Sequence, residues 1–385
     1  MKFKVIELFA GIGSQSKSLK NIGIDYEIVA TSDWDIFANI SYTSVHYYNK
    51  LISKLNQWDK EFKSIGERER ERERERVENV LSKFTLSRDG KYPIKNFNNF
   101  NLRTLYALEQ SLKISNNFSD IKNIKGKELP EHNIITYSFP CQDLSLQGSQ
   151  KGLNEGKASS MLWEVERILR ELKEENRLPK YLLMENVKSL FSNKYQEGFN
   201  KWVKTLEEFG YTNHKFVLNA KYFDIPQNRE RAFMFSELHQ NKFQIPSNNK
   251  ITNKTIGDIL EKDYVSWQQT KGEVIDWNPI KNKNGLAKTK IEGYTTFQSE
   301  TAVFSKESIA PTITATGALN RIKVIEKEGT LRMLTSKEQW QLMGFEKSDW
   351  EKVNSLNIVP ESNLKKQAGN SIVVSVLEAI FKEIK

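Results

Sequence analysis

The sequence predicts an α/β fold, in which a doubly wound, mostly parallel sheet is joined to a second, smaller domain. In roughly the first 240 residues, short apolar runs of strand length alternate with segments whose apolar residues recur at helical spacing. This pattern weakens from about Gln240 to about Thr330, a polar stretch rich in Lys, Asn and Thr. Because alternating strands and helices build parallel sheets, the first part indicates the sheet and the weaker part indicates the smaller domain.

The first 40 residues predict a strand, a glycine-rich turn, a helix and a second strand. Residues 5–9 form a short β-type run that Gly11-Ile12-Gly13 interrupts. Ser14 can cap a helix through Leu19, since a serine side chain accepts hydrogen bonds from the first helical turn. The second strand is expected at residues 27–30, and it ends at Ser32-Asp33-Trp34.

Residues 41–115 are expected to form an irregular insertion. From Glu67 to Arg76, Glu and Arg alternate strictly. On a helix, opposite charges would meet at i,i+3 but like charges would meet at i,i+4, so the electrostatic support is mixed. On a strand, all Glu would face one way and all Arg the other. We expect a solvated, charge-balanced surface helix or a mobile insertion here, rather than a DNA contact.

Three later runs have the composition of buried strands. They lie at residues 134–137, 181–184 and 232–235, and a helix is expected between the first two, where apolar residues recur at helical spacing. A last helix is expected after Gly369-Asn370, with one apolar stripe that packs against the first domain. We therefore expect a large domain of residues 1–237 plus 351–385, and a smaller domain of residues 238–350.

The composition favours a cytoplasmic protein with a polyanionic partner. The net charge is +9 and the isoelectric point is near 9.2, which points first to nucleic acid. No apolar run is long enough for a transmembrane helix, and Glu7 interrupts the N-terminus too early for a signal peptide. Cys141 is the single cysteine, so neither an intrachain disulfide nor a cysteine zinc cage can form, and no metal is expected.

Three groups fall where strands of the predicted sheet end, which is where open α/β sheets bind ligands. They are the glycine turn at Gly11 and Gly13, the lone thiol of Cys141, and Glu185. The glycine turn lacks the third glycine of a dinucleotide fingerprint and has no Walker lysine, but it allows a nucleotide-like ligand to approach closely. About 20 residues further on, Asp33 could bond to ribose hydroxyls and Trp34 could stack on a base.

Taken together and in order, the motifs resemble those of the DNA (cytosine-5) methyltransferase family. The motifs are Phe9-Ala10-Gly11-Ile12-Gly13, Pro140-Cys141-Gln142, Glu185-Asn186-Val187, Gln227-Asn228-Arg229-Glu230-Arg231, the stretch from Arg332 to Phe345, and Gly369-Asn370-Ser371. The resemblance covers most of the chain except residues 41–115 and much of 240–310. It implies the fold of S-adenosylmethionine-dependent methyltransferases.

The resemblance implies a catalytic role for five residues. Cys141 matches the nucleophile, which adds as a thiolate to C6 of cytosine and so raises the electron density at C5. Glu185 matches the acidic residue that hydrogen-bonds N3, a role that needs a raised carboxyl pKa. Arg231 matches the arginine that binds O2 of the base. Asn186 is expected to position the loop around Glu185, and Arg229 to hold the site or a backbone phosphate.

The resemblance also implies S-adenosylmethionine as the cofactor. Phe9, Gly11 and Gly13 would contact its methionine and ribose side. Asp33, where relatives usually have Glu, would bind the ribose hydroxyls, and Trp34 would contact the adenine. The remaining cofactor contacts are expected from Asp120, Ile121, Asn370 and Ser371.

Double-stranded DNA is the partner that the resemblance implies. The target base must leave the duplex, and the loop after Cys141 is expected to fill the gap, with Gln142, Ser145, Gln147 and Lys151 as contacts. Sequence recognition is expected between Arg231 and Arg332. Its candidate contacts are Ser299, Glu300, Thr314, Thr316, Gly317, Asn320, Arg321 and Lys323. Residues 297–300 and 320–323 look similar to mollicute-type enzymes that modify CpG, and a short palindrome such as GATC stays open.

Two other functions stay open from the sequence. One is a tRNA or other RNA cytosine-5 methyltransferase of the same fold, and the other is a catalytically silent DNA-binding protein. The recognition region of about 100 residues disfavours the first, and the presence of Cys141, Glu185 and Arg231 disfavours the second. The resemblance favours a monomer, and neither the bases read nor a restriction partner follows from the sequence.

Overall fold

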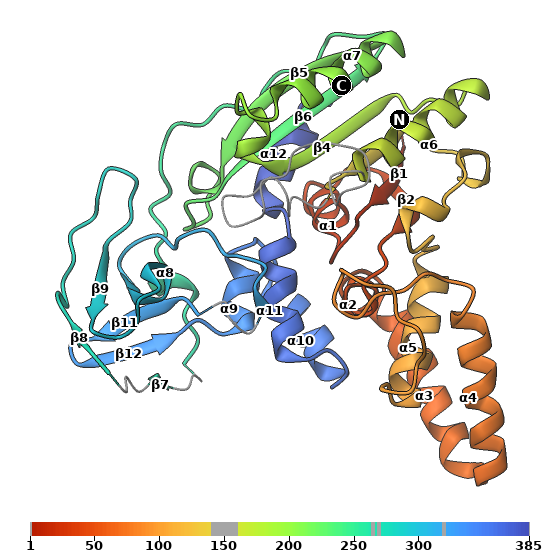
Figure 1. Ribbon diagram of the computed structural model, residues 1–385, viewed down its shortest axis with the longest axis horizontal. Helices are drawn as coiled ribbons and strands as arrows, with labels where there is room; N and C mark the ends of the chain where they lie inside the picture. The colour runs from red at the N-terminus through yellow and green to blue at the C-terminus, as the bar shows by residue number, and fades with distance from the viewer. Residues whose placement is uncertain (1, 140–160, 263–265, 268–270, 318–320, 385) are drawn as a thin grey trace.

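The protein is built around a six-stranded sheet. The computed structural model describes residues 2–139, 161–262, 266–267, 271–317 and 321–384. The strand order is β2 (Tyr26–Ser32), β1 (Phe3–Leu8), β3 (Ile134–Tyr137), β4 (Tyr181–Val187), β6 (Glu230–Leu238) and β5 (Tyr211–Asn219). The first four strands are parallel, whereas β6 runs antiparallel to both β4 and β5. The prediction of a mostly parallel α/β sheet is therefore confirmed (Figure 1).

Helices cover both faces of this sheet because its strands are apolar on both sides. Successive residues such as Val5 and Ile6, or Leu182 and Leu183, belong to different hydrophobic clusters, as the two-residue period of a strand requires. One face carries α1 (Ser14–Asn21) and α12 (Val374–Lys382), and the other carries α6 (Met161–Glu174) and α7 (Gln196–Glu208). The predicted stripe of the last helix is buried, and α12 packs on α1.

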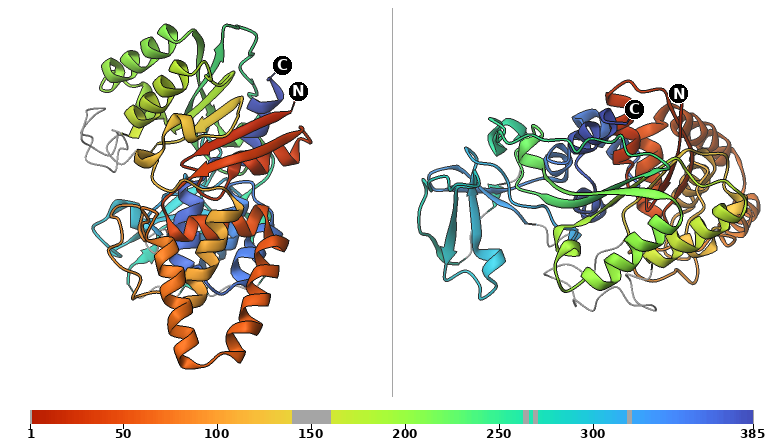
Figure 2. Two further views of the ribbon diagram at one scale, coloured as in Figure 1. Left: turned by 90° about the vertical axis from the view of Figure 1, so that its right-hand side faces the viewer. Right: turned by 90° about the horizontal axis from the view of Figure 1, so that it is seen from above.

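Residues 41–115 do not form the irregular insertion that was expected, and that prediction was wrong. They contain most of α2 (Ile36–His46) together with α3 (Tyr48–Ser64), α4 (Glu67–Leu81) and α5 (Leu102–Ile114). These helices share a core of their own, to which α4 contributes Val77 and Leu81. The alternating tract forms the exposed start of α4, as predicted for a surface helix. In Figures 1 and 2 the α3–α4 hairpin projects from the body of the molecule.

A second six-stranded sheet forms within the region expected for the smaller domain. Its order is β7 (Ser266–Trp267), β12 (Thr330–Met333), β11 (Lys323–Lys327), β10 (Ala302–Ser305), β9 (Lys288–Glu292) and β8 (Glu273–Val274). One side has a small core around Ile291 and Val303. Phe304 and Val324 instead join the cluster that continues into the main sheet. The two sheets are therefore linked by one continuous hydrophobic core.

Three helices connect the second sheet to α12 at the end of the chain. They are α9 (Ser336–Gln341), α10 (Lys347–Ser355) and α11 (Glu361–Asn370), whereas the short α8 (Gln298–Thr301) lies between β9 and β10. The described 3-10 turns are η1 (Ile121–Asn123), η2 (Gly126–Glu128), η4 (Lys188–Phe191), η5 (Ala220–Tyr222) and η6 (Ile256–Ile259). No described helix combines the length and the apolar character that a membrane span needs.

Candidate active site

An acid–arginine pair lies at the carboxyl end of β4. The Arg231 Nε atom is 3.2 Å from the Glu185 Oε1 atom. The sheet brings them together because β4 and β6 are antiparallel, with Val187 opposite Arg231 and Glu185 opposite Phe233. Arg231 is thus the diagonal neighbour of Glu185 on the same face, within reach of a long side chain. The structure brings these two predicted catalytic residues into direct contact.

Glu185 has the electrostatics of a carboxyl group that tends to keep its proton. Only 8% of the residue is exposed, and this burial raises the pKa of Glu185, while the positive charges of Arg231 and Arg229 oppose the rise. The neighbouring Glu230 does not compete for Arg231 through its carboxylate, because that group pairs with Lys188 at 3.0 Å. Arg231 also donates from Nη1 to the main-chain oxygen of Glu230 at 2.8 Å.

Asn186 ties the end of β4 to the end of β3. Its Nδ2 atom donates to the main-chain oxygen of Phe139 at 3.1 Å, and its Oδ1 atom accepts from the Val187 N–H at 2.8 Å. Phe139 directly precedes Pro140-Cys141 in the sequence. The hydrogen bond from Asn186 therefore fixes the backbone just before the predicted nucleophile. Cys141 and the predicted loop contacts Gln142, Ser145, Gln147 and Lys151 lie outside the described residues.

The glycine turn after β1 uses backbone conformations that favour glycine. Gly11 and Gly13 have φ values of +55° and +78°. A Cβ atom on Gly13 would lie 2.2 Å from Nε2 of His46, whose ring nitrogen bonds to the Ile12 oxygen at 3.0 Å. A Cβ atom on Gly11 would meet nothing within 4 Å. The turn is therefore packed tightly on the His46 side and open at Gly11, which fits the close approach of a cofactor.

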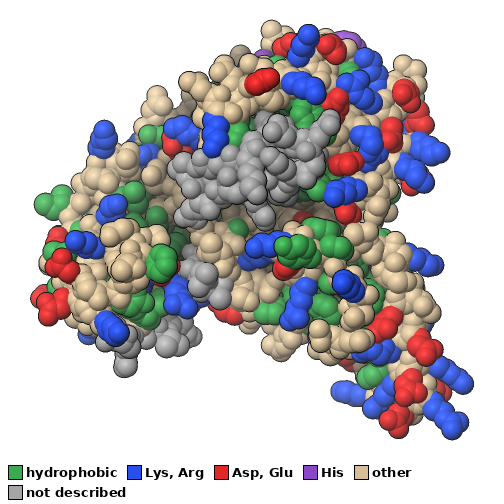
Figure 3. Space-filling view, in the orientation of Figure 1, with side chains coloured by type: hydrophobic (Ala, Val, Ile, Leu, Met, Phe, Trp, Pro, Cys, Tyr) green, Lys and Arg blue, Asp and Glu red, His purple; other side chains and the backbone are tan. Residues whose placement is uncertain are grey.

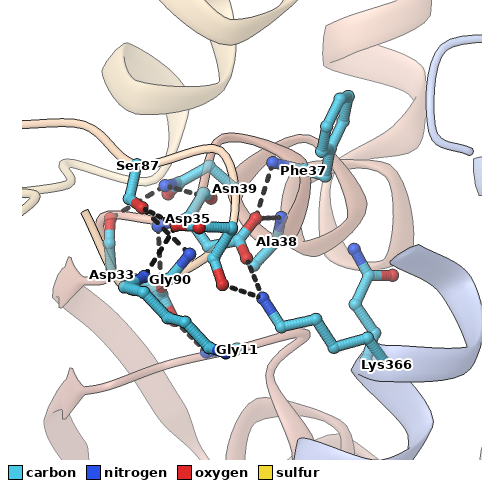
Figure 4. Close-up of polar contacts among 12 residues, drawn as sticks. Gly11, Asp33, Asp35, Phe37, Ala38, Asn39, Ser87, Gly90 and Lys366 are labelled. Atoms are coloured by element: carbon cyan, nitrogen blue, oxygen red, sulfur yellow. Dashed lines mark hydrogen bonds and ion pairs between the residues drawn. The ribbon is translucent and has the colours of Figure 1, made fainter. Parts of the chain in front are cut away.

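Asp33 directly follows β2 and contacts the glycine turn at Gly11 (Figure 4). Its Oδ2 atom accepts from the Gly11 N–H at 2.9 Å, and its Oδ1 atom accepts from the Asp35 N–H at 2.8 Å. Burial, together with the Asp35 carboxylate, raises the pKa of Asp33 to about 6 despite these two hydrogen bonds. Each Asp33 carboxylate oxygen has a further lone pair that can accept a hydrogen bond from a ribose hydroxyl. Asp33 therefore fits the predicted cofactor as a hydrogen-bond acceptor.

Lys366 extends the same polar network to the C-terminal part of the chain. Its Nζ atom bonds to Oδ2 of Asp35 at 3.0 Å and to the main-chain oxygen of Asp89 at 2.6 Å. Asp35 in turn caps α2, accepting from the Phe37 and Ala38 N–H groups at 3.0 and 3.2 Å. Lys366 was not among the predicted site residues, because a lone lysine in a basic chain carries no local signal of its partner.

The other predicted cofactor residues lie around this network with different exposures. Trp34 is half-buried, beside Asp33. Asp120 caps η1 by accepting from the Lys122 N–H at 3.1 Å, and Ile121 is buried in the same cluster as Leu8. Asn370 is exposed at the end of α11, the helix that carries Lys366. Ser371 is buried and donates from Oγ to the Gln367 oxygen at 2.8 Å.

Arg229 does not lie on the surface, where it could meet a phosphate. It is 3% exposed, and its guanidinium donates to the main-chain oxygens of Ile313, Gly369 and Ser371 at 2.7, 2.8 and 2.9 Å. The same motif adds Gln227, which bonds to the Leu342 oxygen and the Ile313 N–H at 2.8 and 3.1 Å. Arg229 therefore joins Ile313, in the predicted recognition region, to Gly369 and Ser371 at the predicted cofactor site, and acts as a positioning residue.

We expect Arg229→Met to lower the free energy of unfolding by about 3 kcal/mol, because three buried carbonyl groups lose a charged donor. Urea denaturation measures this loss. The exposed Arg321→Met is the matched control and should change stability by less than about 0.5 kcal/mol. If Arg229→Met has wild-type stability but binds DNA more weakly and with less salt dependence, Arg229 is a phosphate contact and not a positioning residue.

The predicted DNA-reading residues divide into exposed and buried groups. Ser299, Thr316 and Arg321 are exposed, Thr314 is half-buried and bonds through Oγ1 to Thr316 Oγ1 at 3.0 Å, and Gly317 is buried. Asn320 lies outside the described residues.

Lys323 is buried, so its side chain does not lie where a phosphate contact would be expected. It is 0% exposed and donates to the main-chain oxygen of Glu300 at 2.7 Å. Its Nζ atom also lies over the rings of Trp267 and Tyr294, 5.4 and 5.3 Å from their centroids. Burial lowers the pKa of Lys323, and Glu300 opposes this shift. In this structure Lys323 and Glu300 hold the second sheet together, and they do not present a free cation to DNA.

Glu7 in β1 is a buried acid beside the glycine turn that the sequence analysis did not single out. It is 0% exposed, and its Oε1 atom accepts from the Ser16 N–H at 2.7 Å. Burial raises the pKa of Glu7 to about 7, while the Tyr42 hydroxyl and the Ser16 N–H oppose the rise. Glu7 thus holds the first turn of α1 and keeps a proton at mildly acidic pH.

We expect the raised pKa of Glu7 to make the protein less stable as the pH rises from about 4.5 to about 7. In this window the folded chain binds more protons than the unfolded chain, so the free energy of unfolding falls with pH. The shift corresponds to about 3 kcal/mol. Urea denaturation across this window should show a shallower fall for Glu7→Gln than for wild type or for the exposed Glu230→Gln. Equal slopes for all three proteins would contradict the assignment.

No group of three or more metal-ligating His, Cys, Asp or Glu side chains occurs within residues 2–139, 161–262, 266–267, 271–317 and 321–384. The described polar residues at the sheet edge instead provide a carboxyl group, an arginine and an open glycine turn. This arrangement can bind a polar base on one side and a nucleoside-like cofactor on the other. The two sides meet where β1, β3 and β4 end.

Comparisons with known proteins agree with this chemistry. The orphan methyltransferase M.SssI of Spiroplasma monobiae (strain ATCC 33825 / MQ-1) is 39% identical over 397 residues, which cover 100% of this chain and 97% of that protein. The type II methyltransferase M2.ScrFI of Lactococcus lactis subsp. cremoris is 34% identical over 391 residues, covering 99% and 98%.

Solved structures show the same fold at lower identity. The Dnmt2 methyltransferase of S. pombe matches with a TM-score of 0.60 and 19% identity, covering 98% of this chain and 97% of that one. The methyltransferase EhMeth of Entamoeba histolytica matches with a TM-score of 0.57 and 17% identity, covering 100% and 98%. Residues 91–385 match the sequence profile of the C-5 cytosine-specific DNA methylases. With this match and the two relatives above 30% identity, the chain belongs to the C-5 cytosine-specific DNA methylase family, whose methyl donor is S-adenosylmethionine.

Proposed function

We propose that this protein transfers a methyl group from S-adenosylmethionine to C5 of a cytosine that has been turned out of duplex DNA. The observation that carries the proposal is the buried Glu185 carboxyl, 3.2 Å from Arg231, at the edge of the sheet where β3 leads into Pro140-Cys141. Cytosine C5 is a weak nucleophile and needs activation. A thiol, a protonated acid and an arginine are the groups that such activation uses.

The proposed reaction begins with the Cys141 thiolate, which forms a bond to C6 of the cytosine. The electron pair of the C5–C6 double bond shifts to C5 and is delocalised through C4 onto N3, where the protonated Glu185 carboxyl stabilises the charge by a hydrogen bond. Arg231 binds O2 and holds the base against Glu185. C5 would then take the methyl group, and the electron pair of the broken methyl–sulfur bond would stay on the sulfur, which leaves as the neutral thioether S-adenosylhomocysteine. A base removes the C5 proton, the electron pair of the C5–H bond re-forms the C5–C6 double bond, and the bond between Cys141 and C6 breaks to regenerate the thiolate.

Cofactor binding is assigned to the glycine turn and its surroundings. S-adenosylmethionine supplies a methyl group that its sulfonium already activates. Asp33 would accept hydrogen bonds from the ribose hydroxyls, because its carboxylate is held at the open glycine turn by the Gly11 N–H. Phe9, Gly11 and Gly13 would contact the ribose and methionine side, and Trp34 the adenine. Asp120, Ile121, Asn370 and Ser371 would complete the pocket.

DNA is proposed to lie between the main sheet and the second sheet. In the space-filling view, Lys and Arg side chains lie on this face of both parts (Figure 3). The net charge of +9 adds a general attraction for the phosphate backbone. Flipping the target base costs on the order of a few kcal/mol, which contacts from the loop after Cys141 would offset.

Residues 238–350 are proposed as the target-recognition domain, and residues 1–237 with 351–385 as the catalytic domain. The exposed Ser299, Thr316 and Arg321 are the described candidates for base contacts. A CpG site is our working hypothesis for the sequence that is read, and another short site such as GATC is the alternative. We also propose that the protein acts as a monomer in the cytoplasm, where Cys141 stays reduced. Light scattering of the purified protein, alone and with a duplex, tests the monomer.

Two measurements separate this function from its competitors. Calorimetry with S-adenosylmethionine tests for a cofactor site, which a silent DNA-binding protein would not need. Transfer of a labelled methyl group to a duplex and to a transcript of the same sequence then tests the substrate. We expect cofactor binding and labelling of the duplex alone. Labelling of the transcript alone would move the assignment to an RNA enzyme, and the match to a DNA methylase profile does not favour that outcome.

A further inference from the structure

The segment of residues 87–95, here called the basic loop, connects α4 to α5 and is anchored beside the predicted cofactor site. The Ser87 N–H donates to the Trp34 oxygen at 2.7 Å, and the Ile36 N–H donates to the Ser87 oxygen at 2.9 Å. At its other end, the Ile94 N–H donates to the Leu86 oxygen at 2.8 Å. The backbone of the loop is therefore fixed to the start of α2.

The acid in the basic loop is used to hold the loop itself. Asp89 Oδ1 accepts from the Lys91 and Tyr92 N–H groups at 2.8 and 3.1 Å and from Ser87 Oγ at 3.1 Å. These hydrogen bonds, working against desolvation, leave the pKa of Asp89 lowered. Lys366 reaches the Asp89 main-chain oxygen from α11, and Figure 4 shows it between Asp35 and the loop. Asp89 is exposed, but one of its carboxylate oxygens is occupied by hydrogen bonds within the loop, and the loop has three cations for this one acid.

The outer surface of the basic loop is positive and includes an aromatic ring. Arg88, Lys91 and Lys95 are exposed, and Tyr92 is 73% exposed. Within the described part of the chain, none of the three cations has a carboxylate within 4.0 Å. Arg88 also lies over the Phe100 ring, 5.5 Å from its centroid. Among the described residues, exposed cations without a carboxylate within 4.0 Å occur on α3 and α4 as well, such as Lys54 and Arg68. The basic loop differs from them because it is anchored beside the predicted cofactor site.

The basic loop and the predicted recognition segment lie against the same helix. A Cβ atom on Gly317 would lie 3.1 Å from the Ser362 oxygen and 3.9 Å from Cβ of Lys366. Lys366 is the residue that bonds to Asp89 in the basic loop. Only α11 lies between the two segments. A duplex that is read at residues 314–317 can therefore also reach the basic loop.

We propose that the basic loop binds the phosphate backbone of duplex DNA beside the methylation site, with Arg88, Lys91 and Lys95 as phosphate contacts and Tyr92 against the sugar–phosphate chain. This inference rests on the proposed function and adds a contact surface outside the recognition segment. Phosphate contacts carry no sequence information, so the loop strengthens binding without changing the site that is read. Its attachment through Lys366 and Asp35 keeps the loop at a fixed position relative to the active site.

The test compares two triple variants of the full chain that remove the same charge. The loop variant is Arg88→Gln/Lys91→Gln/Lys95→Gln, and the control is Lys54→Gln/Lys60→Gln/Lys63→Gln, three exposed lysines on α3. Fluorescence anisotropy with a duplex that contains one methylation site gives Kd over a range of KCl concentrations. Calorimetry with S-adenosylmethionine reports whether the site under the loop is intact, and Lys91→Glu serves as a second, single variant.

For the loop variant we expect Kd to rise on the order of 10- to 100-fold at about 0.1 M salt, and the slope of log K against log salt to become shallower by about 2 to 3. The control variant should stay close to wild type, all proteins should bind the cofactor equally, and Lys91→Glu should weaken DNA binding in the same direction. If wild type methylates DNA but the loop and control variants have equal slopes of log K against log salt, the inference about the basic loop is overturned and the proposed function stands. If wild type itself neither binds nor methylates DNA, the proposed function fails instead.

Discussion

Glu185→Gln is expected to slow methyl transfer by about 10²- to 10⁴-fold, with the affinity for S-adenosylmethionine unchanged. The carboxyl of Glu185 is buried at the end of β4, where burial raises its pKa, and it faces Arg231 at 3.2 Å. A protonated acid at this position can stabilise the negative charge that develops on the base at N3. Glutamine keeps the shape and one hydrogen-bond donor, but it has no acidic proton to share.

The pH dependence gives this prediction a second readout. Because the protonated form of Glu185 is the active one, the wild-type rate should fall as the pH rises through its raised pKa. The residual rate of Glu185→Gln should lack that fall. Glu230→Gln is the matched control, since Glu230 is exposed, lies beside Arg231 and pairs with Lys188. A Glu185→Gln enzyme with nearly wild-type turnover would remove Glu185 from the reaction.

Cys141→Ala is expected to abolish methyl transfer and to leave DNA binding intact, because the thiol acts in bond formation and not in affinity. Without the bond to C6, C5 has no activated form. A duplex with 5-fluorocytosine at the target tests the covalent step, since C5 then carries fluorine in place of the proton that must leave. Wild type should form a complex that survives denaturation, and Cys141→Ala should not. A stable complex with the alanine variant, or substantial residual methylation, would exclude Cys141 as the nucleophile.

The parts of the site that the sequence predicted lie in short motifs at the ends of strands, or, for the antiparallel β6, at its start. Gly11 and Asp33 end neighbouring parallel strands and meet by a hydrogen bond of 2.9 Å. Glu185 and Arg231 also belong to neighbouring strands, and the register of β4 and β6 makes them diagonal neighbours. Motifs at strand ends are brought to one edge by the topology alone, so their meeting follows from the fold class.

The parts that the sequence did not predict depend on pairs far apart along the chain. Arg229 bonds to Gly369 and Ser371, about 140 residues away, and Lys366 bonds to Asp35 from the other end of the protein. Nothing near these residues in the sequence marks the partner. In residues 41–115 a surface helix was one of two expectations for the tract, but the shared core of these helices was not predicted. The ten-residue tract is polar throughout, and the apolar residues that anchor α4, Val77 and Leu81, come only after it.

The measurement that tests the central claim most directly is methyl transfer to an unmethylated plasmid, followed by base-resolution sequencing for 5-methylcytosine. Wild type and Cys141→Ala are incubated side by side with S-adenosylmethionine. The account predicts 5-methylcytosine at one short motif in the wild-type sample and none in the Cys141→Ala sample, which would establish the reaction, the nucleophile and the sequence read together. An absence of modified cytosine in both samples, from protein that is folded and binds the cofactor, would contradict it.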